Sequence, residues 1–157
     1  MPNPLYDTLF GKYTGHSTTF LFMPDGKKIS HDSFIRMAGR SANALSEMGL
    51  SVGDRVAVQI DKSPEALAIY AACVQSGLVY LPLNTAYTPT EVSYFIEDSG
   101  AKLFICKGSK EEQLVDVSSK FGASMETLNA DGTGSFPVLT QNKDDSFNTV
   151  ERDAEDL

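Results

Sequence analysis

The stretch SVGDRVAVQIDKSPEALAIYAACVQSGLVYLPLNTAYTPTEVSYFIEDSGAKLFIC, residues 51–106, alternates short apolar runs with helical patterns that carry their own start and stop signals. The apolar runs at 56–60, 78–81 and 102–106 predict strands. Ser63-Pro64 opens a helix that Gly77 closes. Thr88-Pro89-Thr90-Glu91 is a capping box for a second helix, which ends at Gly100. Strands separated by such helices predict right-handed βαβ crossovers.

The alternation of predicted strands and capped helices continues on both sides of this stretch. Downstream, Ser109 with Glu112 predicts another capping box, for a helix stopping at Gly122, and residues 124–128 predict a last strand. Upstream, apolar residues at helical spacing predict a helix from Ser30 to Gly49. A short helix after Asn3-Pro4 and a β-hairpin over 18–30 precede it. The predicted fold class is α/β, with a mostly parallel sheet of four strands built from βαβ units.

The helix expected over Pro64 to Ser76 has no polar face, because Ala66 to Val74 is an unbroken apolar run. A helix that is apolar all round is buried on all sides, whereas one sheet covers only one of them. We therefore expect Ala68, Tyr70, Ala72 or their neighbours to face water on at least one side. Such a face predicts self-association of the chain through this helix.

The 157 residues carry a formal net charge of −8, and half of it lies between Lys143 and Leu157. Residues 129–157 are rich in Gly, Ser, Thr, Asn and Asp, which predicts an acidic linker on the surface after a domain spanning 1–128, with 1–30 as its preface. The acidic balance argues against nucleic acid and anionic membranes as partners. The N-terminus lacks the pattern of a secretory signal and no apolar run could span a bilayer, so we expect a cytoplasmic protein.

Few residues are candidates for a catalytic, nucleotide-binding or metal-binding role. Neither common glycine-rich nucleotide motif is present, and Gly132 to Ser135 predicts a flexible loop that no strand enters and no helix leaves. His16 and His31 are interpreted as surface polar residues. Asp61-Lys62 follows a parallel strand, where a receiver-like protein would hold Mg²⁺ or a phosphoryl group. Neighbouring strand ends add no acids, so a solvated charge pair is favoured. No catalytic, cofactor-binding or metal-binding residue is predicted.

The two cysteines lie in apolar runs, Cys73 in a predicted helix and Cys106 in a predicted strand. Neither has a Cys or His at metal-ligand spacing. We expect two buried, reduced thiols that react slowly with thiol reagents.

Three passages together resemble the N-terminal region of the adenylate-forming acyl-CoA synthetases, a superfamily that includes luciferases and peptide-synthetase adenylation domains. They are Gly53-Asp54-Arg55-Val56, then Gly77-Leu78-Val79-Tyr80-Leu81-Pro82-Leu83-Asn84, then Tyr94-Phe95-Ile96-Glu97-Asp98-Ser99. The sequence from Leu83 to Thr88 is most similar to the corresponding passage of malonyl-CoA synthetases. The resemblance covers roughly residues 5–128 and implies part of the N-terminal subdomain of the luciferase-like fold.

The resemblance implies a parent ligase that converts an acid, ATP and CoA to acyl-CoA, AMP and pyrophosphate through an acyl-adenylate. The family's phosphate loop, Mg²⁺-holding segment, ribose-binding Asp and C-terminal-domain Lys match no position here. The resemblance thus implies that the chain is truncated before the phosphate loop and is inactive as a fragment. It also implies that the remainder of the parent enzyme is the partner of this chain. ATP, Mg²⁺ and CoA would be ligands of the full-length parent and not of this chain. A stand-alone binding module, another acyl-CoA synthetase class and an unrelated receiver-like or flavodoxin-like protein remain alternatives.

Overall fold

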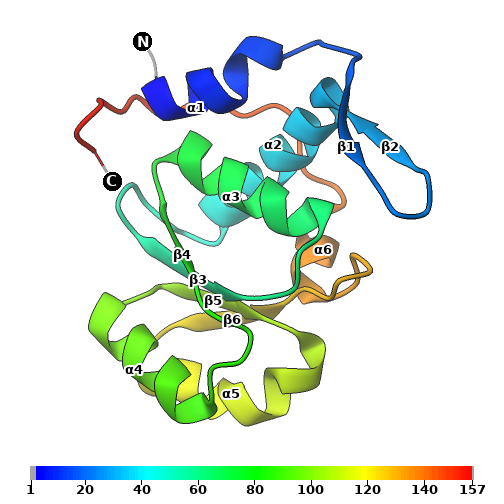
Figure 1. Cartoon of the computed structure of the whole chain (residues 1–157). Coiled ribbons are helices and arrows are strands. Elements are labelled where there is room, and N and C mark those ends of the chain that lie inside the picture. The colour runs from blue at the N-terminus through cyan, green and yellow to red at the C-terminus, as the bar shows by residue number, and fades with distance from the viewer. Residues whose placement is uncertain (1–2, 157) are drawn as a thin grey trace.

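The computed structural model describes residues 3–156, and its centre is a four-stranded parallel sheet (Figure 1). The strands are β3 (Arg55–Gln59), β4 (Val79–Pro82), β5 (Leu103–Cys106) and β6 (Ser124–Thr127), in the order β4-β3-β5-β6. Val56 of β3 lies opposite Tyr80 of β4 and Leu103 of β5. The predicted α/β class and the four strand positions are confirmed.

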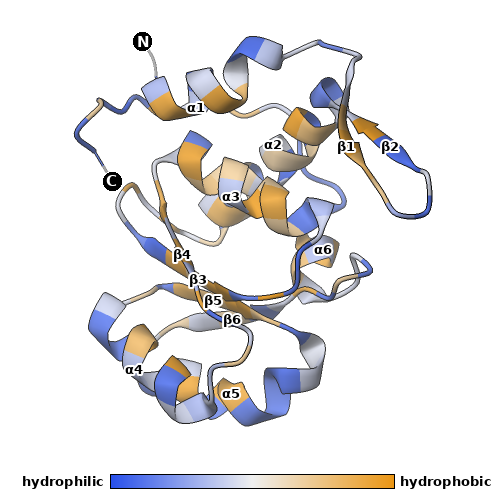
Figure 2. Ribbon diagram, viewed as in Figure 1, coloured by the Kyte–Doolittle hydropathy of each residue, from blue (hydrophilic) through white to orange (hydrophobic). Residues whose placement is uncertain are grey.

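Helices cover both faces of this sheet. Figure 1 shows α4 (Pro89–Ser99) and α5 (Glu111–Lys120) on one face, and α2 (His31–Glu47) and α3 (Pro64–Ser76) on the other. The short helix α1 (Pro4–Leu9), the turn η1 (Gly11–Tyr13) and the hairpin of β1 (Thr19–Phe22) and β2 (Lys28–Ser30) lie outside α2 and α3. Figure 2 shows hydrophobic residues throughout α3, whereas α4 and α5 mix hydrophobic with hydrophilic positions.

The strands supply one hydrophobic core on each side of the sheet, because successive side chains point to opposite faces. Leu103 and Ile105 of β5 pack with the α2 and α3 side. Phe104 and Cys106 pack with α4 and α5. All four side chains are fully buried, as expected for a central parallel strand.

The predicted helix starts are correct in all but one case. Ser30 caps α2, Ser63 caps α3, and Thr88 with Glu91 forms the capping box of α4. The capping box predicted for Ser109 with Glu112 is wrong. Residues Gly108–Lys110 form a single 3₁₀ turn, η2, and α5 begins at Glu111 without a side-chain cap. The backbone amide of Gly108 donates a hydrogen bond to Asn129 Oδ1 at 3.0 Å, and this bond stabilises the turn.

The segment after Asn129 is not the surface linker that its composition predicts. It forms the helix α6 (Ser135–Thr140), whose Phe136 is 2% exposed and belongs to the core beneath α2 and α3. Farther on, the amide of Asn43 donates to the carbonyls of Asp144 and Ser146 at 2.9 and 2.8 Å. These backbone contacts dock the polar segment onto α2, and hydropathy alone does not reveal them.

The same segment helps to cover α3. The backbone amide of Val150 donates to the Gln75 carbonyl at 2.9 Å, and Gln75 Nε2 donates to the Phe147 carbonyl at 3.1 Å. With α2 and α1 packed on the other sides, Ala68 and Ala72 are 1% and 0% exposed. The expectation that these two alanines face water is therefore wrong. Tyr70 remains half-buried.

Candidate functional site

The carboxyl ends of the parallel strands meet at one edge of the sheet, where open α/β folds place their ligands. Gln59 ends β3 there and is fully buried. Its Nε2 donates to the carbonyls of Asn84 at 2.9 Å and Tyr87 at 3.1 Å, in the loop after β4. Lys110 Nζ reaches the Thr85 carbonyl of the same loop at 2.7 Å. These bonds tie the edge loops to one another and leave them little freedom.

Gln59 was not singled out from the sequence. The available signal was a polar side chain in an otherwise apolar strand, because a buried amide needs partners. Its Oε1 has no hydrogen-bond partner within the described residues. Through the two hydrogen bonds that its Nε2 donates, Gln59 fixes the loop after β4 to the central strand β3.

Asp61 at this edge pairs with Lys107 and not with its neighbour Lys62. Asp61 Oδ2 lies 2.7 Å from Lys107 Nζ, so the ion pair joins the loops that follow β3 and β5. The expected Asp61-Lys62 pair is wrong, because Lys62 instead lies beside a groove described below. Among residues 3–156, no group of three or more His, Cys, Asp or Glu side chains is placed to hold a metal ion.

The glycine-rich segment Gly132 to Ser135 is a packed turn. β6 ends shortly before it and α6 begins at Ser135, so the expectation of a loop without flanking elements is wrong. Ser135 Oγ accepts from the Thr127 amide at 2.8 Å and also contacts the Glu126 carboxylate. A side chain at Gly134 would collide with the Thr127 carbonyl, which explains the glycine there. The polar groups of Ser135 therefore form hydrogen bonds that stabilise the turn.

The two histidines pack against aromatic rings. His31 begins α2, and its ring lies 4.6 Å from that of Tyr13 and 4.9 Å from that of Phe20, centroid to centroid. Its Nδ1 lies 3.0 Å from the Thr18 carbonyl. His16 is exposed, as predicted, and contacts Tyr13 edge-on. His31 is half-buried, so the prediction of a surface residue is only partly right.

Both cysteines are free and completely buried, in α3 and β5 as predicted. Burial raises the pKa of the Cys73 thiol far above its ordinary value. Burial, followed by the charge of Glu111, raises the pKa of Cys106 to about 11. Thiols with such pKa values are poor nucleophiles at neutral pH, which suits a structural role.

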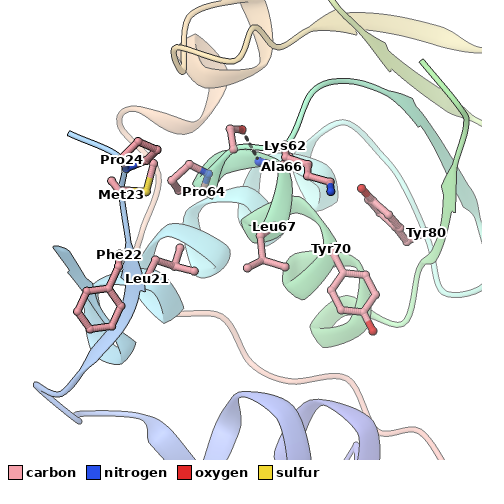
Figure 3. Close-up of a pocket in the computed structure, with 11 residues that line it drawn as sticks. Leu21, Phe22, Met23, Pro24, Lys62, Pro64, Ala66, Leu67, Tyr70 and Tyr80 are labelled. Carbon is pink, nitrogen blue, oxygen red and sulfur yellow. Dashed lines mark hydrogen bonds between the residues drawn. The ribbon is translucent and has the colours of Figure 1, made fainter. Parts of the chain in front are cut away.

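A groove of about 520 Å³ opens between the hairpin tip and the start of α3 (Figure 3). Its lining is almost entirely apolar, and Lys62 is the one charged side chain among the residues of 3–156 that line it. Figure 3 shows Leu67 and Tyr70 of α3 in the groove, with Tyr80 of β4 beside them. Burial raises the pKa of Tyr80 to about 12, so its hydroxyl is neutral at physiological pH. The groove is suited to packing against an apolar surface.

Within residues 3–156, no helix is long and apolar enough to cross a membrane. The longest helix, α2, has 17 residues and an amphipathic pattern.

A protein-family model described as AMP-binding enzyme matches residues 11–157 of the chain. Among curated proteins, the fatty acid–[acyl-carrier-protein] ligase ScoC of Streptomyces coeruleorubidus is 36% identical over 86 residues, which are 55% of this chain and 17% of ScoC. The long-chain-fatty-acid–CoA ligase FadD13 of Mycobacterium tuberculosis is 36% identical over 81 residues, 52% of this chain and 16% of FadD13.

Among solved structures, apo MatB from Rhodopseudomonas palustris matches 100% of this chain with a TM-score of 0.95 and 43% identity, over 31% of the MatB chain. ATP-bound MatB from the same organism gives the same values. The chain thus spans less than a third of the length of these relatives. The similarity to the N-terminal part of acyl-CoA synthetases is confirmed, together with the fold.

Proposed function

The chain belongs to the AMP-binding enzyme family, and from this premise we propose that it is the N-terminal part of a malonyl-CoA synthetase-like ligase. The complete ligase activates malonate with ATP to an acyl-adenylate and pyrophosphate. It then transfers the malonyl group to the thiol of CoA, releasing AMP. This chain supplies a structural layer of that enzyme.

The observation that carries the proposal is the identity to MatB, a malonyl-CoA synthetase, which is 43% across the whole chain. Structures of other acyl-CoA and aryl-CoA ligases with nearly the same coverage fall to 25% identity or below. The passage from Leu83 to Thr88, which resembles malonyl-CoA synthetases, forms the loop that Gln59 anchors at the carboxyl edge. Together these features favour malonate over the fatty and aromatic acids of the other relatives.

The carboxylates of residues 3–156 do not fit a magnesium site. Asp61, two residues after β3 at the carboxyl edge, is neutralised by Lys107. Within residues 3–156, no group of three or more His, Cys, Asp or Glu side chains is placed to serve as a Mg²⁺ ligand set. We therefore propose that the sites for ATP, Mg²⁺ and CoA lie in the remainder of the ligase. That remainder is the natural partner of this chain, and the chain alone is inactive.

The cytoplasm is the proposed location. Cys73 and Cys106 are free thiols packed in two separate cores, on opposite sides of the sheet. Buried reduced thiols are typical of reducing compartments.

A chimera tests the assignment. The chain replaces the matching segment of R. palustris MatB, and the purified chimera is assayed for AMP formation with ATP, Mg²⁺, CoA and either malonate, acetate or a fatty acid. We expect malonate-dependent activity. A matched chimera carries the corresponding segment of the Brucella canis acyl-CoA synthetase, which is 25% identical to this chain.

Two outcomes would contradict the proposal. A folded chimera that is less active with malonate than the matched chimera would assign the chain to another class of acyl-CoA synthetase. A folded chimera without activity toward any acid, beside an active matched chimera, would favour a stand-alone binding module.

A further inference from the structure

The strand order singles out one place along the carboxyl edge of the sheet. The chain leaves β3 through α3 toward β4, and it leaves the adjacent strand β5 through α5 in the opposite direction, toward β6. Helices α3 and α5 lie on opposite faces of the sheet (Figure 1). Open α/β sheets bind their ligands beside the point where the connections of two neighbouring strands diverge in this way. In this chain that point lies at the carboxyl ends of β3 and β5.

Gln59 ends β3 at this point and departs from the pattern of that strand. Residues 56–58 are apolar and buried, whereas Gln59 places a polar amide in the same buried strand with 0% of its surface exposed. Its Oε1 has no hydrogen-bond partner within residues 3–156. A buried acceptor without a partner lowers the stability of a fold. A residue that breaks the local rule at such a cost, at the edge where ligands bind, is typical of a functional position.

In return, Gln59 fixes the backbone of residues 84–87, which we call the β4 loop. Its Nε2 donates to the carbonyls of Asn84 and Tyr87. The Asn84 carbonyl also accepts from the Tyr87 amide at 3.0 Å, so both of its lone pairs are used. From the side of β5, Lys110 Nζ holds the Thr85 carbonyl. The β4 loop is therefore tied to the ends of both strands that flank the point of divergence.

The side chains of the β4 loop remain accessible although its backbone is held. Asn84, Thr85 and Ala86 are exposed, and only Tyr87 is half-buried, with its ring stacked on that of Phe95 at 5.1 Å. A rigid backbone beneath exposed side chains lowers the entropy lost when a ligand binds. The β4 loop thus has the properties of a preorganised contact surface.

We propose that Gln59 is a positioning residue of the ligase, which holds the β4 loop in the conformation that contacts an anionic substrate. The inference rests on the proposed function, whose three substrates malonate, ATP and CoA are all anions. Gln59 itself does not touch the substrate, because it is fully buried. Loss of its two hydrogen bonds therefore weakens substrate binding equally before and in the transition state. Such a loss raises KM and leaves kcat unchanged.

The chain offers a matched control in Gln75, a second buried glutamine. Its Nε2 also donates twice, to the Phe147 carbonyl at 3.1 Å and to Thr149 Oγ1 at 3.3 Å. Its Oε1 likewise has no partner within the described part of the chain. Gln75 lies near the end of α3, shortly before β4 begins, and so at the amino edge of the sheet. The two glutamines share their chemistry and differ in the edge at which they act.

Gln59→Met and Gln75→Met in the MatB chimera test the proposal, because methionine keeps the length of the side chain and removes its amide. Steady-state kinetics are measured for malonate, ATP and CoA in turn. We expect Gln59→Met to raise the KM of one of these substrates roughly tenfold, as the loss of a hydrogen bond does. Its kcat should stay within about twofold. Gln75→Met should leave all three KM values unchanged.

Lys110→Met is a second variant that leaves β3 intact, because Lys110 holds the same loop from outside the strand. It should raise the same KM by a smaller factor. Hydrogen exchange of residues 84–87 verifies that the loop is loosened in both variants. Unchanged KM values with a loosened loop, or equal KM changes for the variants at 59 and 75, would overturn the positioning role while malonate activity remains. A chimera without substitutions that lacks malonate activity would instead contradict the proposed function, and the positioning role with it.

Discussion

Phe136→Ala is the most direct test of how the C-terminal segment packs. Phe136 is 2% exposed and lies in the core with Ile69, Ala72 and Leu128. Removing a buried phenylalanine side chain costs about 3–5 kcal/mol, from lost burial and the cavity left behind. Since α6 has only six residues and is too short to be stable alone, its order depends on this anchor. We expect a loss of at least about 3 kcal/mol, a large part of the stability of a typical domain.

Urea unfolding followed by far-UV circular dichroism measures this loss. Val138→Ala is the matched control in the same helix, because Val138 is 64% exposed and its change should cost under about 0.5 kcal/mol. If Phe136→Ala leaves too little folded protein, Phe136→Leu provides a milder version of the same change. Equal free energies of unfolding for the variants at 136 and 138 would refute the packing. Residues 129–157 would then be the surface linker that their composition predicts.

Three further predictions concern the chain on its own. Gly39→Ala should destabilise it by about 2 kcal/mol or more in urea unfolding, because the new methyl group would collide with the Asp145 carbonyl; a gain in stability, the usual effect of alanine in a helix, would contradict the docking. Cys73 and Cys106 should resist thiol reagents until denaturant is added. Between about pH 9 and 11 the free energy of unfolding should fall as pH rises, because the unfolded chain releases the Cys106 proton while the folded chain keeps it; a flat profile across that interval would argue against burial. With malonate, ATP and Mg²⁺ the chain should catalyse no pyrophosphate exchange, and exchange above the buffer rate would refute its inactivity.

The sheet and its helices were predictable because their signals are local. Ser63 caps α3 three residues before the amide it accepts from, and Gly77 closes the helix in the left-handed conformation at φ 71°. Thr88 and Glu91 are equally close in sequence. The capping box at Ser109 failed where a distant contact intervened, since Asn129 holds the Gly108 amide from 21 residues away. Local rules hold until a long-range hydrogen bond competes with them.

The docking of the C-terminal segment could not be predicted from hydropathy. Several of its contacts with α2 and α3 are made by its backbone carbonyls and amides, which every residue carries. Asn43 reaches Ser146 across 103 positions, and Gln75 reaches Phe147 across 72. One signal was present in the sequence, namely Gly39 inside an otherwise regular helix. An internal glycine is costly there unless another part of the chain must approach closely, as the Asp145 carbonyl does.

At the candidate site, too, the local position of a residue was predictable from the sequence, whereas its long-range partner was not. The sequence correctly placed Asp61 beyond the end of a parallel strand, but its partner is on another loop. Lys62 is adjacent in sequence, whereas Lys107 comes beside Asp61 only because β5 pairs with β3. Strand order therefore decides whether a carboxylate at this edge is available to a ligand. Here it assigns Asp61 to an ion pair between loops.

The hydropathy of α3 predicted an unpartnered apolar surface but not which residues form it. Ala68 and Ala72 lie on the sides that α2 and the sheet cover, so small side chains there allow close packing. The larger Leu67 and Tyr70 lie on the side that remains open. Large apolar groups left at a surface contribute more to association than to the fold of a single copy, because they are buried only when a second surface arrives. The size of the side chains along α3, considered together with the elements that cover it, therefore separates the residues that build the core from those that stay accessible at the surface.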